Sequence, residues 1–159
     1  MRMVRSRAAE WGIDLARIGI MGFSAGGELA AWTSFVGLSR TAGREGNGYP
    51  SAADAVEQVS ARPDFQILIY PGPLAVETSL GDNPPPAFLL AANDDECCSE
   101  PVLKLAQMYR QANVPVEVHL YSKGNHAFNM GSRSSLDSIK TWSQRLTDWL
   151  KDNGWLEKK

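Results

Sequence analysis

Hydrophobic and polar positions along the 159-residue chain alternate in a way that predicts strands separated mostly by helices. Three short apolar runs are typical of buried strands: "RIGIMGF" (17–23), "FQILIY" (65–70) and "AFLLAA" (87–92). The segment "VPVEVHLY" (114–121) alternates apolar and polar residues, as a half-exposed or edge strand does. Strands that alternate with helices predict a parallel sheet, with functional residues at the C-terminal ends of the strands.

Helical spacing predicts one helix before the first strand and one after it. Residues 2–11 favour a helix that ends at Gly12. The helix after the first strand is expected to end near Gly37, and residues 38–53, rich in glycine and polar groups, are predicted to form a long loop. The predicted apolar stripe of that helix consists of Leu29, Trp32 and Val36.

Two further helices are predicted in the second half of the chain, at 101–113 and at about 135–153, the last one ended by Gly154. The apolar side of the first consists of Val102, Leu105, Tyr109 and Ala112. That of the second consists of Leu136, Ile139, Trp142, Leu146, Trp149 and Leu150.

Composition narrows the class of protein. With 43% hydrophobic and 21% charged residues, residues 1–159 are expected to form a single globular domain. A net charge of -2 argues against nucleic acid or an anionic membrane as the main partner. Neither a membrane span nor a secretory signal is apparent, and the adjacent Cys97 and Cys98 are expected to be reduced thiols, so a cytoplasmic protein is predicted. The spacing of the histidines and cysteines matches no zinc motif, and no metal or other cofactor is expected.

A serine between small residues joins the first strand to its helix, in Gly22-Phe23-Ser24-Ala25-Gly26-Gly27. A strained turn of this kind needs small neighbours and points the hydroxyl of Ser24 out of the sheet. The N-terminus of the helix would stabilise developing negative charge, and the Ala25 N–H is the natural first oxyanion donor. Alternatively, Ser24 is an ordinary helix N-cap in a glycine-rich turn.

An acid and a histidine follow the later strands. In Asn93-Asp94-Asp95-Glu96, directly after the third strand, Asp95 is the preferred partner of a histidine and Asp94 the second choice. The alternative is a solvated acidic turn that caps the next helix. His126 lies in a loop after the last strand and is the candidate base, whereas His119 lies within that strand and is expected to be a surface or packing position.

The order Ser24, Asp95, His126 is that of the α/β-hydrolases. The chain resembles that superfamily, and most of all its acetyl-esterase and xylan-esterase branch near the hormone-sensitive-lipase and feruloyl-esterase-like groups. The resemblance implies that Ser24 is the nucleophile, His126 the base and then acid, and Asp95 its partner. It is carried by "AAEWGIDLARIGIMGFSAGGELAA", "ARPDFQILIYPG", "PPAFLLAANDDE" and "YRQANVPVEVHLYSKGNHAF".

Compared with the family that it resembles, the chain is unusual in how few residues precede Ser24. Family members carry about half of their sheet before the nucleophile strand, with a His-Gly-Gly-type loop that completes the oxyanion hole. The expected fold is therefore a truncated or minimal α/β-hydrolase with about four parallel strands and flanking helices. The strand before Ser24 would then be an apolar edge, and a homodimer or higher oligomer is expected to cover it.

The resulting functional hypothesis is a serine esterase that hydrolyses short-chain, acetyl-type esters of small molecules through an acyl-Ser24 intermediate. Trp32 and Phe128 are candidates for lining the acyl pocket. One alternative is a non-catalytic hydrolase half that serves as an oligomeric binding subunit. Another is a serine peptidase of the prolyl-oligopeptidase type, which usually works with a large accessory domain.

Overall fold

The structure is a computed structural model that describes residues 1–35, 54–76, 79–81 and 83–156. The loop predicted at 38–53 lies outside the described residues, as do Val36 and Gly37. The elements in chain order are α1 (Arg2–Ser6), α2 (Ala8–Trp11), β1 (Ile20–Phe23), α3 (Ala25–Phe35), β2 (Gln66–Ile69), the 3-10 helix η1 (Pro73–Val76), β3 (Ala87–Ala92), α4 (Ser99–Gln111), β4 (Val116–Tyr121), α5 (Asp137–Lys140) and α6 (Trp142–Asp152).

The four strands form one sheet in the order β1-β2-β3-β4, and every neighbouring pair is parallel. Ile20 is paired with Gln66, Gln66 with Ala87 and Ala87 with Val116, so the strands begin level with one another. Their C-terminal ends consequently meet at one edge of the sheet, which confirms the predicted fold class. The strand predictions at 87–92 and 114–121 agree with β3 and β4 within two residues.

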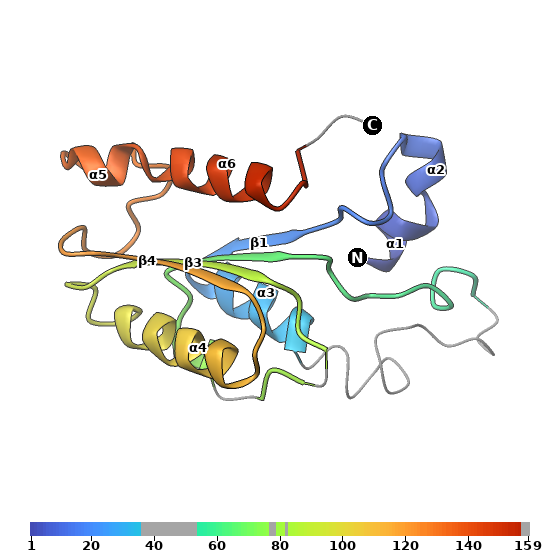
Figure 1. The fold of residues 1–159 in the computed structure, drawn as a ribbon, viewed down its shortest axis with the longest axis horizontal. Coiled ribbons are helices and arrows are strands. Elements are labelled where there is room, and N and C mark those ends of the chain that lie inside the picture. The colour runs from blue at the N-terminus through green and yellow to red at the C-terminus, as the bar shows by residue number, and fades with distance from the viewer. Residues whose placement is uncertain (36–53, 77–78, 82, 157–159) are drawn as a thin grey trace.

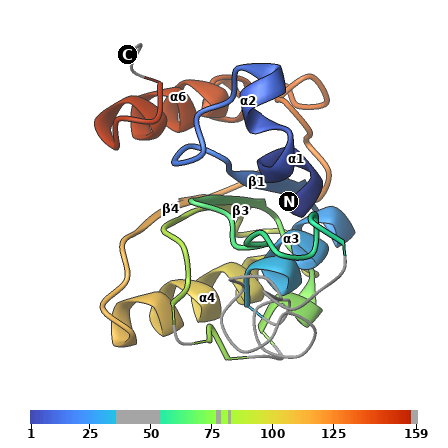
Figure 2. The ribbon, with the colours of Figure 1, turned by 90° about the vertical axis from the view of Figure 1, so that its right-hand side faces the viewer.

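Helices cover both faces of the sheet. Figure 1 shows α5 and α6 over one face and α3 and α4 over the other, with α1 and α2 near the end at which β1 begins. The turned view in Figure 2 shows the same two layers on either side of the strands. All residues of β2 and β3 are buried, so the core lies along these central strands. The outer strand β4 is only half-buried, as its alternating sequence predicts.

The apolar stripe predicted for α3 is wrong. Leu29 and Trp32 are 65% and 51% exposed, and the helix instead buries its small-residue face against β1 and β2. That buried face consists of Gly27, Ala30, Ala31, Ser34 and Phe35. Apolar residues occur all around α3, so their spacing did not identify the face, and small side chains allow the helix to approach the sheet closely.

The other helices agree with their predictions apart from their ends. The first predicted helix is interrupted at Arg7 and ends at Gly12, whose φ of 65° is left-handed. The last is interrupted at Thr141 and divides into α5 and α6. Of the predicted apolar side of the last helix, Leu136 is exposed and Leu150 half-buried, while the buried members are Ile139, Trp142, Leu146 and Trp149. In α4, Val102, Leu105 and Tyr109 are buried, but Ala112 follows the end of the helix and is exposed.

The edge of the sheet at β1 is open. Among the described residues, no strand pairs with the side of β1 that faces away from β2. Met21 of this strand is 40% exposed, and Leu74 of η1 is 50% exposed beside the uncovered face of α3. The predicted apolar edge is therefore present. None of the helices in the described part of the chain combines the length and apolarity of a membrane span.

Candidate active site

Four side chains follow the four strands at the same edge of the sheet. Ser24 comes directly after β1, Tyr70 after β2, Asp95 within three residues of β3, and His126 in the loop after β4. Parallel strands that begin level bring their C-terminal ends together, so residues distant in sequence meet here. Ser24 and His126 are separated by 102 positions and are in hydrogen-bond contact.

The turn at Ser24 is strained and tightly packed. Ser24 has a φ of 51°, a left-handed conformation that is costly for a residue other than glycine. A Cβ atom at Gly22 would lie 2.0 Å from the carbonyl oxygen of Gly26, and one at Gly27 would lie 3.1 Å from Pro71. Close approach therefore requires glycine at position 22 and leaves little room at 27. A Cβ at Gly26 would meet nothing within 4 Å, so the predicted need for a small residue there is not explained by space.

The start of α3 supplies a backbone donor next to the serine. Ala25 is the first residue of α3, and the first N–H groups of a helix have no acceptor within it. The adjacent Ser24 N–H is already used, because it donates to the Ile69 carbonyl at 3.0 Å. The Ala25 N–H thus occupies the place expected of an oxyanion donor, at the positive end of the helix dipole.

The serine, histidine and acid form a continuous hydrogen-bonded chain. Ser24 Oγ lies 2.9 Å from His126 Nε2, and His126 Nδ1 lies 2.7 Å from Asp95 Oδ2. A carboxylate can only accept, so the histidine proton resides on Nδ1 and Nε2 is free to accept the serine hydroxyl. The Asp95 side chain is 1% exposed and that of His126 is 35% exposed, so the acid is buried while the histidine is open to solvent.

Both candidate acids contact the histidine loop, and they do so differently. Asp95 Oδ2 binds the His126 ring, while Asp95 Oδ1 accepts the N–H groups of Cys97 and Cys98 at 3.1 and 3.2 Å. Asp94 Oδ1 instead accepts the Asn125 N–H at 2.8 Å, and this bond holds the pKa of the Asp94 carboxyl below its ordinary value. The structure thus brings Asp95 to the imidazole and uses Asp94 to fix the backbone beside it.

Tyr70 was missed by the sequence analysis. Its ring meets the His126 ring edge-on at a centroid distance of 4.9 Å, and its hydroxyl accepts the Asn129 N–H at 3.1 Å. Burial raises the pKa of the Tyr70 hydroxyl. The available signal was its position at the end of a buried strand, directly before Pro-Gly-Pro.

The loop that carries His126 is held in unusual backbone conformations. Asn125 and Ala127, on either side of the histidine, have φ values of 53° and 61°, and Asn129 has 53°. Most positive-φ residues other than glycine in the described ranges lie in this loop or at Ser24 and Tyr70. Strain of this kind persists only where surrounding contacts enforce it, and it is concentrated here at the proposed site.

The expectation of two reduced thiols is wrong for this structure. Cys97 and Cys98, in the turn that follows Asp95, are joined by a disulfide. The expectation that no metal is bound was based on spacing along the chain and stays a prediction. The fold gathers one potential ligand atom from each of four residues within 4.8 Å, namely Asp95, Cys97, Cys98 and His126. His119, by contrast, remains in β4 and contacts Glu117 at 2.8 Å, as its strand position predicts.

Comparison with known proteins identifies the family. The profile of the dienelactone hydrolase family matches residues 3–154. The chain belongs to the dienelactone hydrolase family. This family member is 26% identical over 191 aligned residues to an acetylxylan esterase of Xylanibacter ruminicola, in a match that covers 98% of the chain and 33% of that protein. It thus spans about a third of the length of this curated relative.

Solved structures confirm the α/β-hydrolase fold of this dienelactone hydrolase family member. An acetyl ester-xyloside bifunctional hydrolase from Caldicellulosiruptor lactoaceticus is 28% identical with a TM-score of 0.80, over 98% of this chain and 64% of that one. A carboxylesterase from Lactobacillus plantarum is 21% identical with a TM-score of 0.75, over 99% of this chain and 66% of that one. The family member therefore matches 64–66% of these two hydrolase chains.

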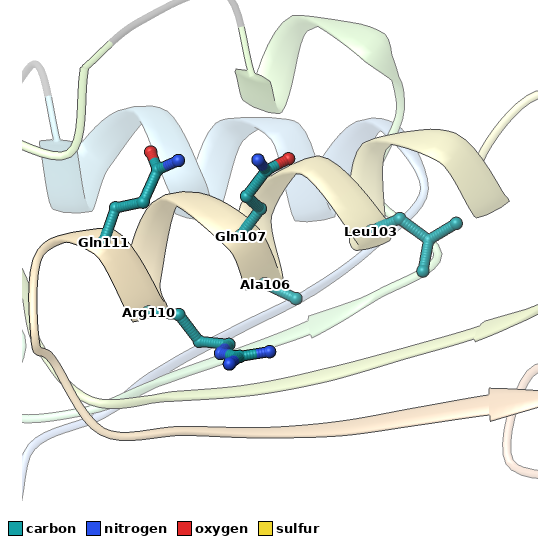
Figure 3. A pocket seen from close by; sticks show the side chains of 5 residues that line it. All are labelled: Leu103, Ala106, Gln107, Arg110 and Gln111. Atoms are coloured by element: carbon teal, nitrogen blue, oxygen red, sulfur yellow. The ribbon is translucent and has the colours of Figure 1, made fainter.

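Two surface hollows of the family member differ in their relation to Ser24. One is lined by Ala25, Glu28, Leu29, Trp32 and Leu74. It therefore lies next to Ala25, the expected oxyanion donor. The other, shown in Figure 3, is lined only by residues of α4 and contains none of the three hydrogen-bonded residues. Phe128 is 1% exposed and its ring packs against that of Tyr70. It is therefore a buried packing residue and is not among the residues that line the first hollow.

Proposed function

We propose that the chain is a serine esterase that hydrolyses short-chain carboxylic esters through an acyl-Ser24 intermediate. The observation that carries the proposal is the unbroken relay from Ser24 Oγ through the His126 ring to the buried Asp95, with contacts of 2.9 and 2.7 Å. Both contacts lie within the range needed for proton transfer between a nucleophile and its base. Membership in a family of ester-cleaving hydrolases agrees with this chemistry.

In the proposed first half-reaction, Ser24 Oγ attacks the ester carbonyl carbon while its proton moves to His126 Nε2. The oxygen of the tetrahedral intermediate takes up negative charge and accepts the Ala25 N–H. The bond to the alcohol oxygen then breaks, and His126 returns its proton to the departing alcohol. Asp95 remains ionised throughout and stabilises the imidazolium through the Nδ1–H bond.

In the second half-reaction, water replaces the alcohol as the nucleophile. His126 Nε2 removes a proton from the water as its oxygen attacks the acyl carbon, and the proton passes to Ser24 Oγ as the acyl bond breaks. A carboxylic acid leaves and the serine is regenerated. The exposure of His126 at 35% of its side chain gives water a route to the reacting carbon.

An acetyl group is the proposed acyl class. Two of the relatives carry acetyl esters in their names, the acetylxylan esterase and the acetyl ester-xyloside hydrolase. The apolar hollow beside Ala25 is shallow enough to remain open to solvent at Leu29 and Trp32, which are 65% and 51% exposed. A small acyl group needs little enclosure, so this open hollow suits an acetyl group better than a long acyl chain.

The open β1 edge supports the further proposal that the chain works as a homodimer or higher oligomer. Backbone groups alternate along a strand. The N–H groups of Ile20 and Ser24 donate to the carbonyls of Phe65 and Ile69, at the two ends of β2, so the backbone groups of Met21 and Phe23 point to the open side. An apolar edge of this kind is a template for pairing with another chain. A second copy at this edge would also lie near Ser24 and could supply a further oxyanion donor. In other enzymes, removal of one such donor lowers kcat by about 10²- to 10³-fold.

The proposal is tested by the turnover of p-nitrophenyl acetate by the wild type and by Ser24→Ala. Removal of the nucleophile is expected to lower kcat by about 10⁴-fold or more. Equal rates in the two proteins would show that Ser24 is not the nucleophile. The same open edge favours a second candidate function, a folded but non-catalytic oligomeric subunit, and failure of a fluorophosphonate to label Ser24 in the wild type would support it.

A further inference from the structure

The proposed esterase reaction makes no use of the two cysteine side chains beside its acid. Cys97 and Cys98 lie on the turn between β3 and α4, and their contribution to Asp95 is through backbone N–H groups alone. Their sulfur atoms nevertheless belong to the group of four potential ligand atoms within 4.8 Å, together with Asp95 and the His126 ring. Two sulfurs, an imidazole and a carboxylate are a donor set suited to thiophilic divalent cations.

The size of this group matches a single cation. Bonds of about 2.3 Å to sulfur and about 2.0 Å to nitrogen or oxygen place tetrahedral ligand atoms roughly 3.3–3.8 Å apart. The four atoms here all lie within 4.8 Å of one another, and the two sulfurs reach the required spacing only after the bond between them is broken and they move apart. The outer contacts are present as well, since Asp95 Oδ1 accepts two backbone N–H groups and is held in orientation by them.

The disulfide keeps the site closed in the oxidised chain, because sulfur atoms bonded to each other are not thiolate ligands. A dithiol or phosphine reductant opens it by supplying two electrons, and with two protons from solvent the sulfur–sulfur bond becomes two thiols. Each thiol then releases one proton when it binds a cation. Cys97 is exposed and Cys98 is fully buried, so both reductant and cation would enter from the side of Cys97 and His126.

We propose that the reduced chain binds one thiophilic divalent cation of the Zn²⁺ or Cd²⁺ kind through Cys97, Cys98, Asp95 and His126 Nδ1. Neutral imidazole binds a metal through a nitrogen that carries no proton. The proton now on Nδ1 therefore moves to Nε2, and the Nδ1 contact to Asp95 is replaced by the metal. The four ligands carry three negative charges against two positive ones, which suits a site with one exposed side.

This proton shift has a direct consequence for Ser24. Nε2 accepts the serine hydroxyl in the metal-free chain at 2.9 Å, but a protonated Nε2 can no longer do so. Metal binding would thus remove the general base without blocking the surface physically. This consequence rests on the proposed esterase function, whereas the binding of the cation does not.

The test uses the chain in two oxidation states and Cd²⁺ alone as the probe. The protein is reduced with a phosphine, freed of reductant and metal, and titrated while the thiolate-to-cadmium absorption in the ultraviolet is followed. We expect the band to saturate at one Cd²⁺ per chain in reduced protein and to be missing in oxidised protein of the same preparation. Oxidised wild type is a control that does not depend on the folding of any variant.

Variants assign the ligands. Cys98→Ser is expected to lower the intensity of the band, because Cys97 remains as a single thiolate, and His126→Gln to weaken binding by about tenfold or more. Ser24→Ala, which removes no proposed ligand, should bind as the wild type does. Absence of the band in reduced wild type would overturn the proposal. So would equal binding by wild type and His126→Gln, since the sulfurs alone would then hold the ion.

Ester turnover separates this proposal from the esterase itself. Cd²⁺ or Zn²⁺ is expected to inhibit the reduced enzyme at least about tenfold more than the oxidised enzyme, with recovery on addition of a chelator. A cadmium band without ester turnover in any state would reject the esterase and keep the metal site. Ester turnover that metal leaves unchanged, with no band in the reduced protein, would reject the metal site and keep the esterase.

Discussion

The two halves of the candidate site are supported very differently. Asp95 follows β3, an interior strand whose six residues are all buried, and its side chain is 1% exposed. Ser24 follows β1, an edge strand that contains Met21 and packs against α3, the helix that carries Leu29 and Trp32. These three residues are 40%, 65% and 51% exposed. The acid half is therefore enclosed by this chain, whereas the nucleophile half faces an uncovered apolar surface.

This contrast separates the parts of the proposed reaction that the described residues organise from those that they do not. Orientation of the base needs only contacts among described residues: the Asp95 carboxylate, the Tyr70 ring and the Asp94 bond to the loop. Stabilisation of the oxyanion needs donors on both sides of Ser24, and the described residues provide Ala25 on one side. We therefore expect variants of the acid half to alter chemistry and variants of the β1 edge to alter assembly.

Among the variants that compare the two halves, the largest effect on turnover is expected from Asp95→Asn in the enclosed half. An amide cannot hold the proton on His126 Nδ1 in the same way, so the wrong tautomer forms and kcat should fall by about 10⁴-fold. Asp94→Asn is the matched control, because it leaves the Asp95–His126 contact in place, and its loss should stay below about tenfold. Steady-state kinetics with p-nitrophenyl acetate measure both. Equal losses would show that the two acids share one role.

The next effect concerns the turn beneath Ser24. Gly22→Ala would place a Cβ 2.0 Å from a backbone oxygen, and we expect the free energy of unfolding to fall by about 3 kcal/mol or more. Gly26→Ala has open space and should change it by less than about 1 kcal/mol. Denaturant unfolding of both variants measures the difference. A Gly22→Ala protein as stable as Gly26→Ala would contradict the packing described for the elbow.

A third effect compares the two edges of the sheet. A lysine at Met21 on β1 is expected to weaken self-association by at least about tenfold, because a charge at an apolar edge opposes pairing. Val118→Lys on the opposite edge strand β4, where Val118 is 36% exposed, should leave association unchanged. Light scattering over a range of protein concentrations reports both. A wild type that stays monomeric throughout would remove the proposed oligomer.

The smallest effect is expected from Tyr70→Phe. The variant keeps the ring against His126 but loses the hydroxyl that accepts the Asn129 N–H, which is worth about 1 kcal/mol. We expect a loss of about fivefold in kcat with little change in KM, since only the orientation of the base is affected. Tyr121→Phe on β4 is the control. A larger change in KM than in kcat would place Tyr70 in substrate binding instead.

The sheet and the histidine loop were predictable from the sequence because their signals are local. β3 is a continuous apolar run between prolines and an acidic turn, and β4 alternates, so both were located nearly to the residue. The stripe on α3 was not predictable, because apolar residues surround that helix and the choice of face depends on how closely it approaches β2. Leu29 and Trp32 thus turned out to be its exposed side.

Other features of the site depend on contacts between segments that are distant in sequence. The choice between Asp94 and Asp95 depends on how the turn after β3 meets a loop 31 positions later, which spacing alone does not determine. Tyr70 was overlooked because a tyrosine that ends a buried strand usually serves packing. The Cys97–Cys98 disulfide was not predicted because a bridge between adjacent residues is strained and rare. The approach of His126 to Asp95 and the two cysteines joins segments that are distant in sequence.

Direct detection of the acyl-enzyme tests the central claim most sharply. The wild type and Ser24→Ala would be mixed with p-nitrophenyl acetate, quenched in acid and examined by intact and peptide mass spectrometry. We expect one acetyl group per wild-type chain, located on Ser24, and none on the variant. An unmodified wild type that still turns over the ester, or acetyl groups on another residue in both proteins, would contradict it.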